Sequence, residues 1–166
     1  MIPYRVKQFY WAFASIVKKD NMELLNSYLN EKELNIFMEM SKAERQHSVR
    51  VFNTAMKYIR DNNIKINEFK LGRCALLHDI GKSRIKINTI EKSIIIILKF
   101  ITGDMILKYN KRIEDYYNHG EIGSNILSQL GENDSEIIMC VANHHNKDRD
   151  IGNMYLDIIS MCDDLC

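Results

Sequence analysis

The chain has 166 residues, which is enough for one domain with a hydrophobic core and too few for two domains of ordinary size. Hydrophobic residues make up 46% of it, which excludes a natively disordered chain, and 23 basic residues against 22 acidic ones give a formal net charge of +1. This balance provides neither a basic field that attracts nucleic acid nor a polybasic membrane anchor.

Features of secreted and membrane proteins are also missing from the sequence. Its four cysteines include no CxxC pair, and three lie in apolar helical patterns, where a reduced thiol packs as a small hydrophobic group. The N-terminus has no basic stretch followed by an uninterrupted apolar segment and a cleavage site. The most apolar run, Ile94 to Leu98, is far shorter than the roughly 20 residues that cross a bilayer. We expect a reduced, soluble, cytoplasmic protein.

Hydrophobic residues recur at helical spacing from the start of the chain. The single proline, Pro3, fits the first turn of a helix over about residues 4–18. Asp20 or Asn21 can cap a short second helix that ends near residue 29, and Asn30 can cap a third. The inner face of that third helix is predicted to carry Leu34, Phe37 and Met38.

Two central helices carry the first histidines. A helix over about residues 42–60 is predicted because hydrophobic residues follow His47 at four-residue steps, so this imidazole lies on the buried side. The next helix, about residues 66–80, ends in the string CALLHDIG. Gly81 is typical of a C-terminal cap. The pair His78-Asp79 is therefore predicted on the last turn of a buried helix, beside a chain reversal.

The second half of the chain is also predicted to be helical, with short polar breaks. After a connector over residues 83–89, helical patterns cover about residues 89–101, 105–117, 121–130, 135–145 and 154–165. His119 is placed at a helix start, His144 at a helix end, and Asp163 near the end of the last helix. No segment alternates with a period of two residues, so we predict one all-α domain.

Five histidines occur in the chain, and none lies in a charged surface stretch. Asp79 and Asp163 sit within apolar runs, and burying a lone carboxylate costs several kcal/mol unless something compensates its charge. A divalent metal bound by imidazoles and carboxylates would supply that compensation. This ligand set suits iron, manganese or zinc, and no cysteines occur at zinc-finger spacing.

Each of these residues alone has a commoner structural role. A single histidine on an apolar helix face usually packs in the core, and His78 with Asp79 could form an ion pair at a helix end. Asp163 could be an ordinary acid beside an exposed Asp164, and Glu44 is interpreted as a helix first-turn acid. Tyr116 and its neighbour Tyr117 are interpreted as core residues, with a place at a pocket mouth as the alternative. The coincidence of all the histidines and buried acids favours a metal site in the core of a helical bundle.

The ordered set of histidines and aspartates, with the intact string HDIGK at residues 78–82, resembles the HD-domain superfamily and its HDIG branch over residues 42–164. Members of this superfamily are helical bundles with one or two metals in their core, and many hydrolyse phosphomonoesters or phosphodiesters of nucleotides. The resemblance implies an HD domain over residues 42–166, with residues 1–41 as an N-terminal helical segment packed on the bundle.

The resemblance also implies roles for individual residues. One metal ion would be held by His47, His78, Asp79 and Asp163. Asp79 would bridge to a second ion held by His119 and His144, with His145 as a further ligand, an orienting group or a substrate contact. The cofactors would then be two divalent ions, iron, manganese or another transition metal.

We therefore expect a metal-dependent phosphohydrolase that uses a metal-bound hydroxide, with Asp79 and Lys82 as catalytic residues. Lys82 would bind a phosphate of the substrate, and its ordinary alternative is a solvated lysine. The expected partner is a small-molecule phosphoester, a nucleotide, with no membrane and no nucleic acid; a homodimer is left open.

Several narrower or different functions remain alternatives. The chain is similar to the HD-GYP cyclic dinucleotide phosphodiesterases, but Asn146 follows the histidine pair where those carry glutamate, and no GYP string occurs. It is also similar to the small hydrolases of diadenosine tetraphosphate, but lacks their threonine-rich stretch. From other classes, the ligand order also resembles HD-type di-iron oxygenases, and a non-catalytic nucleotide-sensing module would keep the same fold.

Overall fold

The computed structural model describes residues 19–85, 91, 103, 111–146 and 152–166. The regular elements in these ranges are all helical, which confirms the predicted all-α class. They are α2 (Met22–Tyr28), α3 (Glu31–Glu39), α4 (Lys42–Asp61), α5 (Glu68–Leu77), the 3₁₀-helix η1 (Ile80–Arg84), α8 (Lys111–Tyr117), α9 (His119–Leu130), α10 (Ser135–Asn143) and α11 (Met154–Leu165). The helices predicted over residues 4–18 and 89–101 lie outside the described residues, except for Glu91, which is helical.

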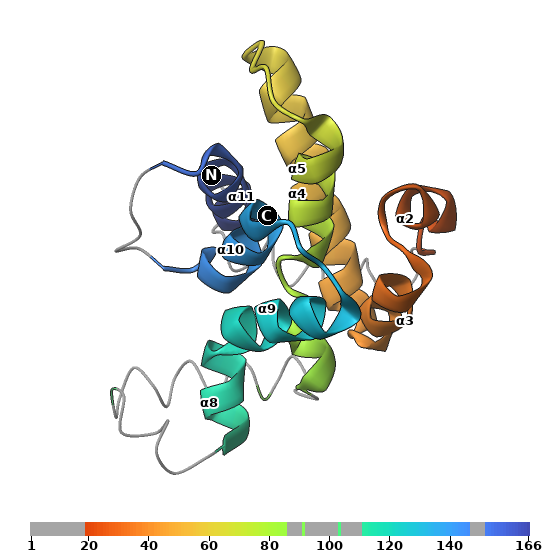
Figure 1. Cartoon of the computed structure of the whole chain (residues 1–166), viewed down its shortest axis with the longest axis vertical. Coiled ribbons are helices and arrows are strands. Elements are labelled where there is room, and N and C mark those ends of the chain that lie inside the picture. The colour runs from red at the N-terminus through yellow and green to blue at the C-terminus, as the bar shows by residue number, and fades with distance from the viewer. Residues whose placement is uncertain (1–18, 86–90, 92–102, 104–110, 147–151) are drawn as a thin grey trace.

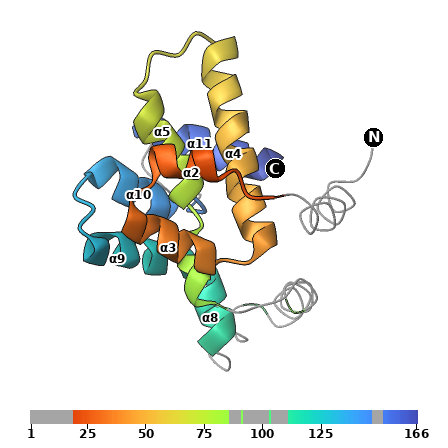
Figure 2. The ribbon, with the colours of Figure 1, turned by 90° about the vertical axis from the view of Figure 1, so that its right-hand side faces the viewer.

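The helices α4 and α5 form an antiparallel pair at the centre of the bundle (Figure 1). The pair α10 and α11 packs on one side, and α2 and α3 lie on the other (Figures 1 and 2). The helix α9 crosses the end of the bundle, where it contacts η1 and α10 and continues from α8. Among the described helices, none combines the length and the apolar character that crossing a membrane requires.

Polar side chains fix where the first three described helices begin. Asn21 and Asn30 accept hydrogen bonds from the backbone N–H groups of α2 and α3, which confirms both predicted caps. Asp20, the other candidate, instead accepts hydrogen bonds from Arg45 of α4. Glu44 forms a capping box with Ser41 at the start of α4, which confirms its interpretation as a first-turn acid.

One hydrophobic core fills the bundle and includes residues from α2 to α5 and from α9 to α11. The prediction for α3 was partly wrong. Phe37 is fully buried and Leu34 packs against the core, but Met38 is 37% exposed, and Met40 just after the helix is buried instead. Consecutive residues of a helix point about 100° apart, so a narrow inner face that includes Phe37 excludes its neighbour. The four cysteines are buried and free.

A buried ion-pair cluster ties α3 to the rest of the bundle. The guanidinium of Arg73 on α5 binds Glu33 of α3, and its Nη2 lies 2.6 Å from Oε2 of Glu132 in the turn after α9. Glu33 is only 1% exposed. Because the three residues come from distant parts of the sequence, this cluster fixes how α3, α5 and the α9–α10 turn sit together.

Candidate metal centre

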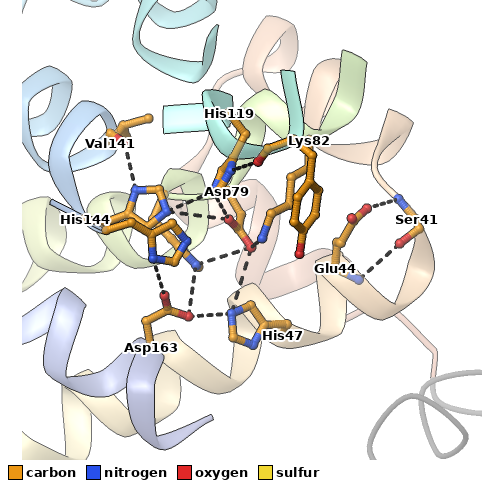
Figure 3. Close-up of polar contacts among 12 residues, drawn as sticks. Ser41, Glu44, His47, Asp79, Lys82, His119, Val141, His144 and Asp163 are labelled. Carbon is orange, nitrogen blue, oxygen red and sulfur yellow. Dashed lines mark hydrogen bonds and ion pairs between the residues drawn. The ribbon is translucent and has the colours of Figure 1, made fainter. Parts of the chain in front are cut away.

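Seven side chains from different elements converge at one place in the core, and Figure 3 labels His47, Asp79, His119, His144 and Asp163 among them. His47 comes from α4, His78 follows α5, Asp79 precedes η1, and Asp163 lies on α11; His119 begins α9, and the pair 144–145 follows α10. Their ligand atoms form two groups that could each hold a metal ion. Group A contains His47, His78 and Asp163, and group B contains Asp79, His119, His144 and His145. The structure thus brings together every residue predicted as a metal ligand.

Three of the imidazoles are oriented by the same kind of hydrogen bond to the backbone. Nδ1 of each lies within hydrogen-bonding distance of the carbonyl oxygen three residues earlier: His78 at 2.8 Å from Ala75, His119 at 2.7 Å from Tyr116, and His144 at 2.8 Å from Val141. A carbonyl oxygen can only accept, so Nδ1 carries the hydrogen in each ring. In the neutral imidazole, Nε2 is then an unprotonated acceptor directed into the site.

Group B places three acceptor atoms against one another. Nε2 of His119 and Nε2 of His144 are 3.2 Å apart, and Oδ1 of Asp79 lies 3.1 Å and 3.7 Å from them. No hydrogen bond satisfies three acceptors that carry no proton. Ligand atoms about 2.1 Å from a shared ion lie about 3 to 3.5 Å from one another, so this spacing fits a bound cation.

Group A contains one hydrogen bond, between His47 and Asp163, and one unsatisfied acceptor, on His78. Nε2 of His47 lies 2.7 Å from Oδ1 of Asp163, and Nε2 of His78 lies 3.7 Å from the same oxygen. Nε2 of His78 is buried without a hydrogen-bond partner, as is Oδ1 of Asp79 in group B. Leaving such atoms unsatisfied is costly, and a divalent metal in each group would satisfy them.

Asp79 faces both groups. Its Oδ1 belongs to group B, whereas its Oδ2 lies 3.5 Å from Nε2 of His78 and 3.9 Å from Nε2 of His47. Burial raises the pKa of this carboxyl, but the positive charge of Lys82 acts against this effect, and the pKa lies well below its usual value. A carboxylate with one oxygen toward each group has the arrangement of a ligand that bridges two ions.

Lys82 lies inside the site. Its Nζ is 2.7 Å from Oδ2 of Asp79, and its side chain is only 13% exposed, which excludes the alternative of a solvated lysine. Burial lowers the pKa of the ammonium, but the charge of Asp79 outweighs this and keeps the pKa above its usual value. The site therefore holds a fixed positive charge beside the carboxylate that faces both groups.

Gly81 has a different role from the predicted one. It lies within η1 and does not adopt the left-handed conformation of a helix cap. A Cβ at this position would lie 1.9 Å from the carbonyl oxygen of His119 and 2.7 Å from the backbone nitrogen of Gly123. The missing side chain lets the turn after Asp79 pack directly on the first turn of α9. This contact sets the distance between Asp79 and His119.

His145 lies at the edge of the site. It is exposed, its ring centroid is 4.2 Å from that of His144, and its Nδ1 lies 3.7 Å from Oδ2 of Asp163. It is therefore within reach of both groups. One further residue was missed in the sequence: Ser160 of α11 donates a hydrogen bond to the carbonyl oxygen of His144 at 2.8 Å and holds the end of α10 in place. A serine in an apolar helix gave no signal for this contact.

An all-helical bundle with histidine and aspartate groups that meet at a buried carboxylate has the features of a metal-binding enzyme fold. A family model for the HD domain matches residues 45–163. The chain belongs to the HD domain family, whose members are mostly metal-dependent hydrolases, and the predicted superfamily is confirmed. No curated protein and no solved structure matches the sequence.

Proposed function

We propose that this protein hydrolyses a phosphomonoester or phosphodiester of a nucleotide, with two divalent transition-metal ions, iron or manganese, held by groups A and B. The observation that carries the proposal is the contact of Nε2 of His119, Nε2 of His144 and Oδ1 of Asp79, three acceptors without a proton between them. Membership of a family of metal-dependent hydrolases supports it. We assign the chain to the HDIG branch on the string HDIGK at residues 78–82.

The residues of the site divide the work of the reaction. A divalent ion supplies a Lewis acid for the phosphoryl group and lowers the pKa of water. Asp79 directs one oxygen toward each group and so fixes the two groups relative to one another. The backbone carbonyls fix the imidazole rings, so that little reorganisation of these rings is needed during the reaction. The ammonium of Lys82 binds a phosphoryl oxygen and offsets negative charge that develops during the reaction.

Elemental analysis followed by an ester panel tests the proposal. Protein purified without added metal identifies the ion, and that ion is then supplied while phosphate release is measured from nucleotide monoesters and diesters. Lys82→Ala should lower kcat/KM by about tenfold or more and leave the metal content unchanged, because a hydrogen bond to a charged group is lost. Lys57→Ala is the matched control, since Lys57 is an exposed residue of α4. Metal-loaded protein that hydrolyses no ester would contradict the proposal.

The same assay separates the two rival functions. A di-iron oxygenase would use the same imidazole and carboxylate ligands, and it would consume O2 during turnover without releasing phosphate. A nucleotide-sensing module would bind a nucleotide tightly and turn over nothing. An oxygen electrode and a nucleotide-binding titration, run on the same metal-loaded sample, distinguish all three.

A further inference from the structure

The hydroxyl of Ser160 on α11 donates its hydrogen bond to a different helix. Serine hydroxyls in helices commonly bind the backbone of their own helix, and those of Ser27, Ser124 and Ser128 bind carbonyl oxygens three or four residues earlier. The hydroxyl of Ser160 instead binds the carbonyl oxygen of His144 at 2.8 Å. Ser160 and His144 are 8% and 3% exposed, so water has little access to this hydrogen bond. The bond therefore ties α11 to the residue that follows α10.

The carbonyl group of His144 needs such a partner. His144 comes directly after the last residue of α10, and the carbonyl groups at the end of a helix have no N–H partner within it. Burying a carbonyl group without a hydrogen bond is costly. Ser160 supplies the hydrogen bond and thereby fixes the main chain of a residue whose imidazole belongs to group B.

The helix α9 holds the same end of α10 by direct packing of the two backbones. A Cβ on Gly120 would lie 2.7 Å from the carbonyl oxygen of Ala142 and 3.0 Å from that of Val141. The carbonyl oxygen of Val141 is the one that orients the ring of His144. The main chain around His144 is thus fixed by α9 and by α11, and its Nε2 lies 3.2 Å from Nε2 of His119.

One turn of α11 reaches both groups of ligands. Asp163 lies three residues after Ser160, so the two side chains are neighbours on one side of the helix. Oδ1 of Asp163 lies 2.7 Å from Nε2 of His47 in group A, and its Oδ2 lies 3.7 Å from Nδ1 of His145 in group B. A hydroxyl that holds a residue of group B and a carboxylate of group A therefore come from the same rigid element.

We propose that Ser160 is a positioning residue of the metal centre: through the main chain of His144, it holds this imidazole at the spacing that group B needs to bind a metal ion. Because Asp163 lies on the same turn, α11 also fixes group B relative to group A. The inference rests on the part of the proposed function that places metal ions in the two groups, and it does not depend on which ester is hydrolysed.

Ser160→Ala tests this role with Mn2+ as the probe. The substitution removes the hydroxyl, keeps every predicted ligand, and introduces a residue that favours a helix. In a titration followed by the electron paramagnetic resonance signal of free Mn2+, the wild type should bind two ions. In Ser160→Ala, one of the two should bind about 10- to 100-fold more weakly, as is typical when a group that orients a metal ligand is lost. Ser124→Ala is the matched control and should bind both ions like the wild type, because Ser124 is also 8% exposed and its hydroxyl binds within α9.

Two further backgrounds assign the weakened ion to a group. His47→Ala disables group A, and adding Ser160→Ala to it should weaken the remaining ion by the same about 10- to 100-fold. His119→Ala disables group B, and adding Ser160→Ala to it should change the Kd of the remaining ion by less than about twofold. A general loss of stability would weaken both backgrounds alike and would reduce the helical circular dichroism signal.

Three results would overturn the inference: wild-type Kd values for both ions in Ser160→Ala, equal weakening in the two backgrounds, or the same weakening in Ser124→Ala. A wild type that binds two Mn2+ ions, one of them dependent on Ser160, but hydrolyses no ester would contradict the proposed function and keep this inference.

Discussion

Two buried polar clusters in this protein differ in how the charges of their carboxylates are compensated. In the cluster around Arg73, the guanidinium lies between the carboxylates of Glu33 and Glu132, so each acceptor faces a donor. In the metal centre, Asp79 is equally buried, at 1% exposed, but most of its neighbours are unprotonated imidazole nitrogens. A guanidinium placed between the carboxylates compensates the first cluster, whereas in the second the ammonium of Lys82 binds Oδ2 of Asp79 and leaves Oδ1 of Asp79 and Nε2 of His78 without a hydrogen-bond partner. The first cluster therefore joins elements of the fold, whereas the second contains ligand atoms that could hold a metal ion.

Replacing Asp79, the carboxylate that faces both groups, should have the largest effect. Asp79→Asn keeps the volume of the side chain and removes one ligand charge shared by groups A and B. Because substitutions that only touch a metal ligand already cost about 10- to 100-fold, we expect metal affinity and kcat/KM to fall by about 100-fold or more. The helical circular dichroism spectrum should be retained. Asp164→Asn, at the exposed neighbour of Asp163, is the control; full metal content in Asp79→Asn would contradict the bridging role.

Removing Arg73 should lower the stability of the fold and leave the metal content unchanged. Arg73→Met leaves the buried carboxylate of Glu33 with the backbone N–H of Asn30 but without the guanidinium that binds it, and should lower the free energy of unfolding by about 3 kcal/mol, measured by urea denaturation with a chelator present. Lys57→Met removes an exposed ion pair with Asp61 and should cost less than about 1 kcal/mol. Equal losses in both variants would show that burial does not distinguish the Arg73 cluster.

Adding metal should stabilise the wild type and the Arg73 variant alike. Metal at about 100 times its Kd should raise the free energy of unfolding by about 2.7 kcal/mol for each site that it fills, because it binds only the folded state. Arg73→Met should show the same increment, since its cluster shares no residue with the metal centre, and Asp79→Asn should show almost none. A smaller increment in Arg73→Met would mean that the two clusters are coupled.

The membership of the metal centre could be predicted from the sequence because its residue types are rare in apolar runs. Several histidines and two aspartates that occur within hydrophobic patterns are costly to bury, and a bound cation would compensate them. The helices that carry them follow from periodicity and from caps such as Asn30 and Ser41. These signals are local, and each reports on one helix at a time.

What could not be predicted depends on contacts between distant segments. Gly81 looked like a helix cap, and the reason for a glycine there is the backbone of His119, which no local pattern contains. Met38 lies outside the buried face of α3 because the core that this face contacts is narrow. The hydroxyl of Ser160 donates its hydrogen bond to the carbonyl oxygen of His144, at the end of another helix. The burial of the Lys82 side chain likewise follows from the packing of η1 on α9 and α3.

The most direct test of the central claim is a crystal structure of the metal-loaded protein with an anomalous difference map collected at the absorption edge of the bound metal. We predict two peaks, one on each side of the Asp79 carboxylate, at about 2.0 to 2.3 Å from the nearest Nε2 and carboxylate oxygens. The absence of a peak in both groups, or metal bound with Asp79 outside its coordination sphere, would contradict the claim that this carboxylate joins two metal sites.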